Sequence, residues 1–148
     1  MWRRNADGKG RIYQSVKYMK VNINDGGRSQ YFKADGVGDC VCRAVAIATG
    51  KDYKEVYNTI KTITKQNPRN GLTSRATRKV CEYFGGRWVA TMKIGSGCQV
   101  HLREEELPKG RIICSVSGHV TCVIDGVIND TYDCSRGGTR CVYGYWIF

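Results

Sequence analysis

The spacing of apolar residues changes about midway along the chain. Between residues 39 and 86 they recur every three or four positions, which is typical of helices that bury one face. Three helices are predicted here: one over 40–49, one that opens at Asp52 and one that opens at Thr73. Asp and Thr are favourable N-cap residues, and Gly50 directly after the first helix is a C-terminal signal.

From residue 87 to the end, apolar residues alternate with polar ones or form short runs rich in β-branched and aromatic side chains. This pattern is typical of strands. We expect strands at 88–92, 111–116 and 141–148, with a hairpin around the dipeptide Asp125-Gly126. Helices followed by an antiparallel meander predict an α+β fold in which the sheet packs against the first helix.

The N-terminal residues carry weaker signals. Residues 2–16 show no sustained period and are expected to form a loose basic arm. Residues 18–23 and 29–32 flank the turn sequence Asn-Asp-Gly-Gly, which predicts a second hairpin.

The length of the chain favours one domain. With 148 residues it can bury a core without metal or disulfide support. We expect the basic arm and hairpin in 1–38, the helical part in 39–86 and the antiparallel sheet in 87–148. No apolar run is long enough to span a membrane, and the first residues lack the apolar core of a secretion signal. These features predict a soluble, cytoplasmic protein.

Cys40 is the first candidate for chemistry. It follows the predicted N-cap Asp39 and therefore lies in the first turn of a helix. Unpaired N–H groups and the helix dipole favour the thiolate there, and the thiolate is the nucleophilic form of cysteine. Alternatively, Cys40 and Cys42 are small buried hydrophobic residues, a common role for free cysteine.

A histidine and a carboxylate meet in the hairpin predicted near the C-terminus. If Asp125 and Gly126 form the turn, His119 and Asp130 are diagonal neighbours on one face of the sheet. A carboxylate in that place fixes the tautomer of a histidine and stabilises its imidazolium form. A strand histidine is often structural, but with Cys40 upstream the order Cys/His/Asp is that of a cysteine nucleophile with a distant base.

Several short motifs occur in a characteristic order. They are Asp39-Cys40, Arg43-Ala44, 46–51, Val56-Tyr57, 107–111, 115–119, 125–131 and 142–146. In this order they resemble small phage-encoded papain-like cysteine peptidases, over roughly residues 35–148. The resemblance implies a papain-like α+β fold, with an N-terminal catalytic helix packed against an antiparallel sheet. It also implies that Cys40 is the nucleophile, His119 the base and Asp130 its orienting partner, with no cofactor.

The sequence departs from that family at one position. Many papain-like enzymes carry a glutamine about six residues before the cysteine, where its amide helps to stabilise the oxyanion. Here Ala34 occupies that place, and Gln30 lies ten residues before Cys40. The sequence therefore identifies the backbone N–H of Cys40 as one oxyanion donor and leaves the second unassigned.

We expect all eight cysteines to be reduced and free of metal. Their spacing is not that of a compact secreted framework, and most lie in runs already assigned to helices or strands. The nearest approaches to zinc-ligand spacing are Cys98-x-x-His101 and Cys40-x-Cys42, and no C-x-x-C pair occurs. His101, the second histidine of the chain, is expected at the surface.

The positive charge is concentrated in two regions. The net charge is +11; residues 1–38 hold eight Lys/Arg against three Asp/Glu, and residues 51–79 hold eight against two. An acidic partner is possible through Lys54, Lys61 and Lys65, which lie off the apolar face of the second helix. Nucleic acid is possible too, but no nucleic-acid-binding motif accompanies the charge. Alternatively, the lysines form a solvated surface that keeps the protein soluble.

The sequence thus leaves two functions open. The first is a cysteine peptidase or amidase of phage type that cleaves an amide bond in an unidentified peptide or protein, in the host cytoplasm if the chain is phage-encoded. The second is an inactive papain-like fold that acts as a basic adaptor for a host protein or nucleic acid. A cell-wall amidase fits less well, because the length leaves no room for a wall-binding module.

Overall fold

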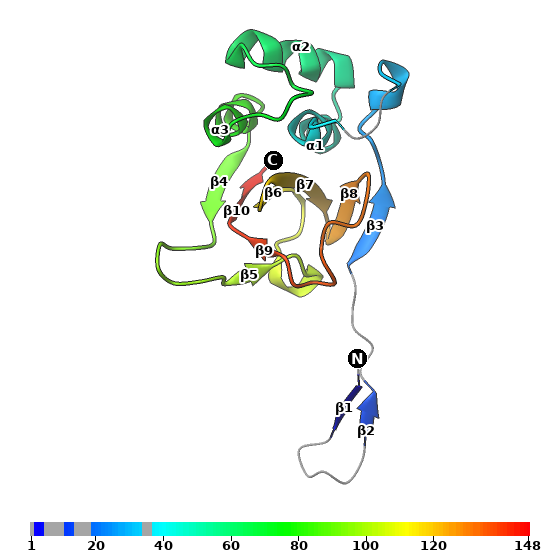
Figure 1. Ribbon diagram of the computed structural model, residues 1–148, viewed down its shortest axis with the longest axis vertical. Helices are drawn as coiled ribbons and strands as arrows, with labels where there is room; N and C mark the ends of the chain where they lie inside the picture. The colour runs from blue at the N-terminus through cyan, green and yellow to red at the C-terminus, as the bar shows by residue number, and fades with distance from the viewer. Residues whose placement is uncertain (1, 5–10, 14–18, 34–36) are drawn as a thin grey trace.

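The computed structural model describes residues 2–4, 11–13, 19–33 and 37–148 of the chain. Within these ranges the fold is α+β: three α-helices cover one face of a twisted, mostly antiparallel sheet (Figure 1). This confirms the α+β part of the predicted fold class. In the part of the chain described, no helix combines the length and the apolar character needed to cross a membrane.

The three helices lie where the sequence predicts them. They are α1 (Cys40–Thr49), α2 (Tyr53–Thr64) and α3 (Ser74–Tyr83). The Asp52 side chain accepts hydrogen bonds from two N–H groups of the first turn of α2, and Thr73 caps α3 by accepting from Ala76. Gly50 ends α1 with a φ of 71°, a conformation that glycine adopts without steric penalty.

The main sheet has six strands in the order β3-β8-β7-β6-β10-β4. They are β3 (Lys20–Ile23), β8 (Val127–Asp130), β7 (His119–Ile124), β6 (Arg111–Val116), β10 (Gly144–Ile147) and β4 (Arg87–Ala90). All neighbours pair antiparallel except β3 and β8, which are parallel. A separate pair, β5 (Val100–His101) and β9 (Cys141–Val142), lies on the side of the sheet away from the helices (Figure 1).

Strand β6 shows how the sheet divides the core. Ile113 points into the cluster beneath the helices, together with residues of α1 such as Val45. Its neighbours Ile112 and Cys114 point into a second cluster on the opposite face. All these side chains are fully buried, so the apolar run of β6 is explained by burial on both faces. Helix α1 packs directly on β7, which places the N-terminus of α1 beside the first residue of that strand.

The hairpin of β7 and β8 has the predicted register. Ile124 pairs with Val127, and the two turn residues Asp125 and Gly126 both have positive φ angles, 48° and 79°. Positive φ at both central positions is the geometry of a type I′ turn, which Asp-Gly favours. Asp125 is exposed, and its carboxylate accepts a hydrogen bond from the N–H of Gly110.

The second predicted hairpin is wrong. Residues 29–32 do not form a strand; instead a 3₁₀ helix spans Arg28–Gln30. The Asp25 carboxylate accepts hydrogen bonds from the N–H groups of Gly27 and Ser29, which satisfies the start of that helix locally. Strand β3 therefore finds its partner in β8, about a hundred residues further along the chain.

The N-terminal arm, which was expected to be loose, contains two short strands. Strands β1 (Trp2–Arg4) and β2 (Arg11–Tyr13) pair antiparallel, with Arg3 opposite Ile12. The remaining residues of the predicted arm, and residue 18 of the predicted hairpin, lie outside the described residues.

Candidate active site

Cys40 is the first residue of α1, as the sequence predicts. The preceding residue, Asp39, has the N-cap position, but its side chain makes no hydrogen bond to the first turn. Its carboxylate is fully buried and instead accepts hydrogen bonds from Arg28, Arg43 and Tyr53. The N–H groups of the first turn therefore keep their positive potential for another acceptor.

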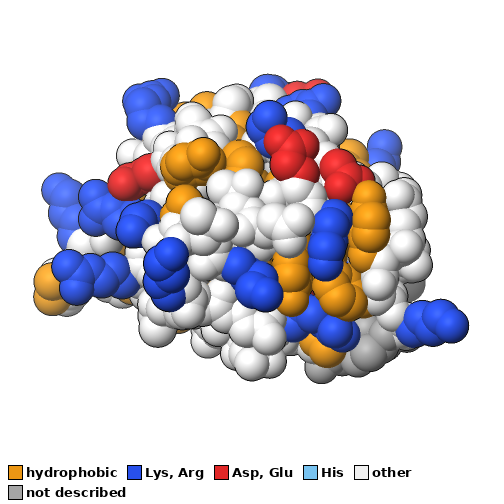
Figure 2. Space-filling view, turned by 90° about the horizontal axis from the view of Figure 1, so that it is seen from above, with side chains coloured by type: hydrophobic (Ala, Val, Ile, Leu, Met, Phe, Trp, Pro, Cys, Tyr) orange, Lys and Arg blue, Asp and Glu red, His pale blue; other side chains and the backbone are white. Residues whose placement is uncertain are grey.

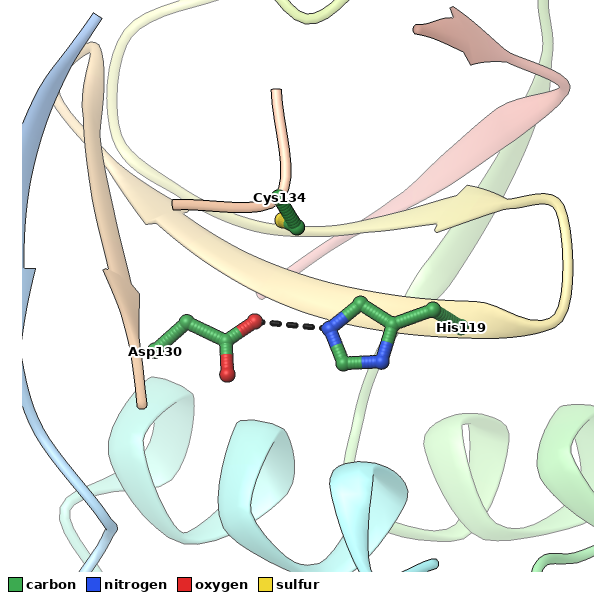
Figure 3. A group of neighbouring side chains, drawn as sticks. All are labelled: His119, Asp130 and Cys134. Atoms are coloured by element: carbon green, nitrogen blue, oxygen red, sulfur yellow. Dashed lines mark hydrogen bonds and ion pairs between the residues drawn. The ribbon is translucent and has the colours of Figure 1, made fainter. Parts of the chain in front are cut away.

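His119 and Asp130 are joined by a hydrogen bond of 2.7 Å between Nε2 and Oδ2 (Figure 3). Both residues come from the ends of neighbouring strands, His119 opening β7 and Asp130 closing β8. Since Nε2 is bonded to Asp130, the nitrogen left for Cys40 is Nδ1, which Figure 3 shows on the side of the ring away from the carboxylate.

Charge holds this pair in its ionised form. Burial acts to lower the pKa of His119, but its hydrogen bond to Asp130 and its contacts with Cys134 and Cys40 raise it to about 11. Burial acts to raise the pKa of Asp130. The hydrogen bond to His119, the charge of His119 and a hydrogen bond from the N–H of Thr131 instead lower this pKa to about 2. The pair is therefore an imidazolium and a carboxylate over the whole neutral range.

The Cys40 thiol responds to the same charge. Burial opposes its ionisation, but the hydrogen bond and charge of His119, the N–H of Val120 and the charge of Arg43 lower its pKa below the ordinary value. Four other free cysteines, which are buried in the core, differ: burial raises the pKa of Cys42, Cys81, Cys114 and Cys122. Cys40 thus combines partial exposure with a stabilised thiolate.

Arg43 is the residue of this site that the sequence analysis did not single out. Its side chain is 7% exposed, and its guanidinium donates to Asp39 and, over 3.2 Å, to Oδ1 of Asp130. Asp39 and Arg43 are four residues apart at the start of a helix, a spacing that favours ion pairs and was the available signal. The contact with Asp130 spans 87 residues and leaves no such local pattern.

Two cavities flank the cysteine and the histidine. One, of about 250 Å³, has apolar walls that include Leu72 and Trp146. The other, of about 700 Å³, is more polar and includes Arg43 and Tyr132. Gly38, Cys40, Gly118 and His119 line both. Cys40 and His119 therefore lie between two cavities, with room for a ligand on either side.

Cys134 lies near His119 and Asp130, above their hydrogen bond in the view of Figure 3. Ligand atoms of His119, Asp130 and Cys134 are all within 4.8 Å of one another, so these three side chains are the candidate metal ligands among the described residues. In this arrangement, however, Nε2 of His119 is already bonded to Asp130. The geometry therefore favours an oriented base over a metal centre at this point.

The prediction that all eight cysteines are reduced is wrong for two of them. Cys98 and Cys141 form a disulfide, with their Cα atoms 5.9 Å apart. The pairing of β5 with β9 places His101 opposite Cys141 and so brings the Cys98 segment to the same place. His101 is not simply a surface residue either, since its side chain is 28% exposed and contacts Glu106.

Neither position considered for the glutamine donor is among the described residues that line the cavities beside Cys40. Ala34 lies outside the described residues, and Gln30 is not among the residues that line the two cavities. The backbone N–H of Cys40 remains the donor that the sequence identifies.

Comparison with protein-family models, with curated proteins and with solved structures gives no match for this chain.

Proposed function

We propose that the protein is a papain-like thiol hydrolase of phage type that cleaves an amide bond in a peptide or protein. The observation that carries this proposal is the chain of contacts from Cys40 through His119 to Asp130, between two cavities that both reach Cys40 and His119. A helix that carries the nucleophile against an antiparallel sheet that carries the base is also the arrangement expected of a papain-like fold.

Each residue has a distinct role in the proposed reaction. The Cys40 thiolate attacks the amide carbonyl carbon, and the carbonyl oxygen takes the negative charge. His119 then gives its Nδ1 proton to the leaving amine, which departs and leaves a thioester on Cys40. Water gives a proton to His119 as it attacks the thioester, and release of the carboxylic acid regenerates the Cys40 thiolate. Asp130 orients the ring and stabilises the imidazolium throughout.

The start of α1 supports the charged intermediate. Because Asp39 directs its carboxylate to Arg28, Arg43 and Tyr53, it does not compete for the N–H groups of the first turn. The N–H of Cys40 and the positive end of the helix are then available to the oxyanion. This arrangement gives a physical reason why the chain can do without a glutamine six residues before the cysteine.

The test combines labelling with cleavage. The full chain is treated with iodoacetamide, the labelled peptides are mapped by mass spectrometry, and a peptide library is assayed for cleavage products. We expect preferential labelling of Cys40, and cleavage that is lost in Cys40→Ala but kept in Cys42→Ala. An unlabelled Cys40 together with identical products from both variants would rule out the hydrolase.

One observation favours the adaptor as the second candidate. On the helical face, Lys54 lies 4.7 Å from the ring centre of Tyr57, Lys61 lies 5.8 Å from the same ring, and Arg69 lies 4.3 Å from that of Phe32. Figure 2 shows Lys and Arg side chains spread over this face, with acidic side chains at few places. A basic and aromatic surface of this kind suits an acidic protein or a nucleic acid.

A further inference from the structure

A second group of sulfur, imidazole and carboxylate lies on the other side of the sheet from Cys40. Strands β5 and β9 pair there, on the side of the sheet away from the helices (Figure 1). The disulfide joins Cys98, which is exposed, to Cys141, which is partly buried. Both residues of the disulfide are therefore at least partly accessible to a solute.

His101 is held against this disulfide. Its Nε2 lies 3.7 Å from Sγ of Cys98, and its Nδ1 lies 3.2 Å from Oε1 of Glu106. The same Glu106 oxygen accepts a hydrogen bond from the backbone N–H of His101, so the carboxylate fixes both the ring and the strand. Arg103 in turn lies 3.4 Å from the other oxygen of Glu106.

We propose that Cys98–Cys141 is a thiol–disulfide exchange site that reacts with a dithiol, with His101 stabilising Cys98 as the leaving thiolate. The inference does not depend on the hydrolase proposed above, because it involves neither Cys40 nor His119. It rests on three positions: an exposed disulfide, an imidazole in contact with one of its two sulfur atoms, and a carboxylate that orients the imidazole.

The exchange proceeds in two balanced steps. A thiolate of the dithiol attacks Sγ of Cys141, a new S–S bond forms, and the electron pair of the old bond passes to Cys98. His101 stabilises that charge or donates its proton to it, since a leaving thiol of lower pKa departs faster. The second thiol of the reagent then loses its proton to water. The resulting thiolate attacks the other sulfur of the reagent, which is bonded to Cys141 in the mixed disulfide. Cys141 is released and takes a proton from water, and a second proton from water returns to His101 or, where Cys98 has stayed a thiolate, protonates Cys98. The dithiol thus loses two electrons and two protons, and the protein gains both.

The position of His101 decides which sulfur leaves. It contacts Cys98, so the electron pair is stabilised there rather than on Cys141. A monothiol, which cannot complete the second step by itself, should therefore be trapped on Cys141. This outcome distinguishes a directed exchange site from a disulfide that is merely exposed, because exposure alone would favour attack at Cys98.

The experiment uses the full chain purified without reductant. Dithiothreitol is added for increasing times, free thiols are alkylated, and Cys98 and Cys141 are quantified by peptide mapping. His101→Gln should slow their release about fivefold, because it removes the group that stabilises the leaving thiolate. Glu106→Gln should slow it less, and Glu105→Gln, a change on the same 3₁₀ helix (Glu104–Glu106), should leave the rate unchanged.

Glutathione then serves as the monothiol probe, and the mixed disulfide is expected mainly on Cys141. Far-UV circular dichroism of each variant verifies folding, and the Glu106→Gln rate carries the test should His101→Gln fail to fold. The proposal is overturned if Cys98 and Cys141 are alkylated without reductant, if neither variant slows their release, or if glutathione is found mainly on Cys98.

Discussion

Arg43 and Asp130 form a buried ion pair, in which Nη2 of the arginine lies 3.2 Å from Oδ1 of the aspartate. The other oxygen of Asp130 is the one that bonds to His119. Asp130 therefore divides its carboxylate between a permanent cation and the proposed base, and Asp39 holds the arginine from its other side. Arg43 is a positioning residue: it reaches the histidine through Asp130, and its charge also lowers the pKa of Cys40.

Replacing Arg43 tests that role. Arg43→Met is expected to lower the free energy of unfolding by about 3–5 kcal/mol, because it leaves Asp39 and Asp130 buried without their shared cation. Arg43→Lys keeps the charge but not the fork that reaches two carboxylates, so we expect a smaller loss. Urea unfolding measures both changes.

The control for Arg43 is Arg78→Lys, since Arg78 pairs with an exposed glutamate and should change the free energy of unfolding by less than about 0.5 kcal/mol. A purely structural role of Arg43 would change the free energy of unfolding but not the reactivity of Cys40. We therefore also expect the pH profile of Cys40 alkylation to shift in Arg43→Lys. An unshifted profile in a folded Arg43→Lys variant would contradict the positioning role.

The reaction of Cys40 with iodoacetamide should depend on pH in a defined direction. Its lowered pKa means that the rate rises with pH to a plateau, with a midpoint below the ordinary cysteine value. The raised pKa of His119, about 11, keeps the imidazolium in place across that plateau. In His119→Ala the midpoint should move to higher pH, because the charge and hydrogen bond of His119 no longer oppose the effect of burial. Equal midpoints in the two proteins would show that His119 does not stabilise the thiolate.

Asp130 and Asp125 form a matched pair for testing the orienting role. Asp130→Asn removes the negative charge beside His119, so the pKa of the histidine should fall and amide cleavage should slow by roughly tenfold or more. Asp125→Asn lies in the turn of the same hairpin, and asparagine accepts the same positive φ, so cleavage should be unchanged. Titration of the histidine by NMR and initial rates of cleavage check the two effects. Similar rates for both variants would remove Asp130 from the mechanism.

Sequence reasoning located those features whose causes are local. The N-terminus of α2 follows from Asp52, whose side chain caps it, and the register of the β7–β8 hairpin follows from Asp125-Gly126. In each case neighbouring residues determine the backbone geometry, so a single sequence contains the information.

The features that sequence reasoning missed depend on contacts between distant residues. Arg43 and Asp130 are separated by 87 residues, and the two cysteines of the disulfide by 43. The parallel pairing of β3 with β8 also joins residues far apart in the chain. The local turn residues predicted a hairpin instead, but the Asp25 carboxylate accepts hydrogen bonds that begin a 3₁₀ helix there. No local pattern encodes such pairs, because they form only when the complete sheet and core are assembled.

The two proposed functions predict opposite outcomes for two kinds of substitution. If the protein is a hydrolase, Cys40→Ala should abolish its cellular effect and change the free energy of unfolding little, because the partly exposed sulfur lines a cleft and leaves no large cavity. Replacing Lys54, Lys61 and Lys65 together by glutamine should then alter only salt-sensitive association. If the protein is an adaptor, Cys40→Ala should be harmless, and the triple lysine variant should lose binding that already weakens steeply with salt. Cellular phenotype, urea unfolding and binding at two salt concentrations measure these outcomes. We expect the hydrolase pattern, and an unchanged phenotype in a folded Cys40→Ala variant would contradict it.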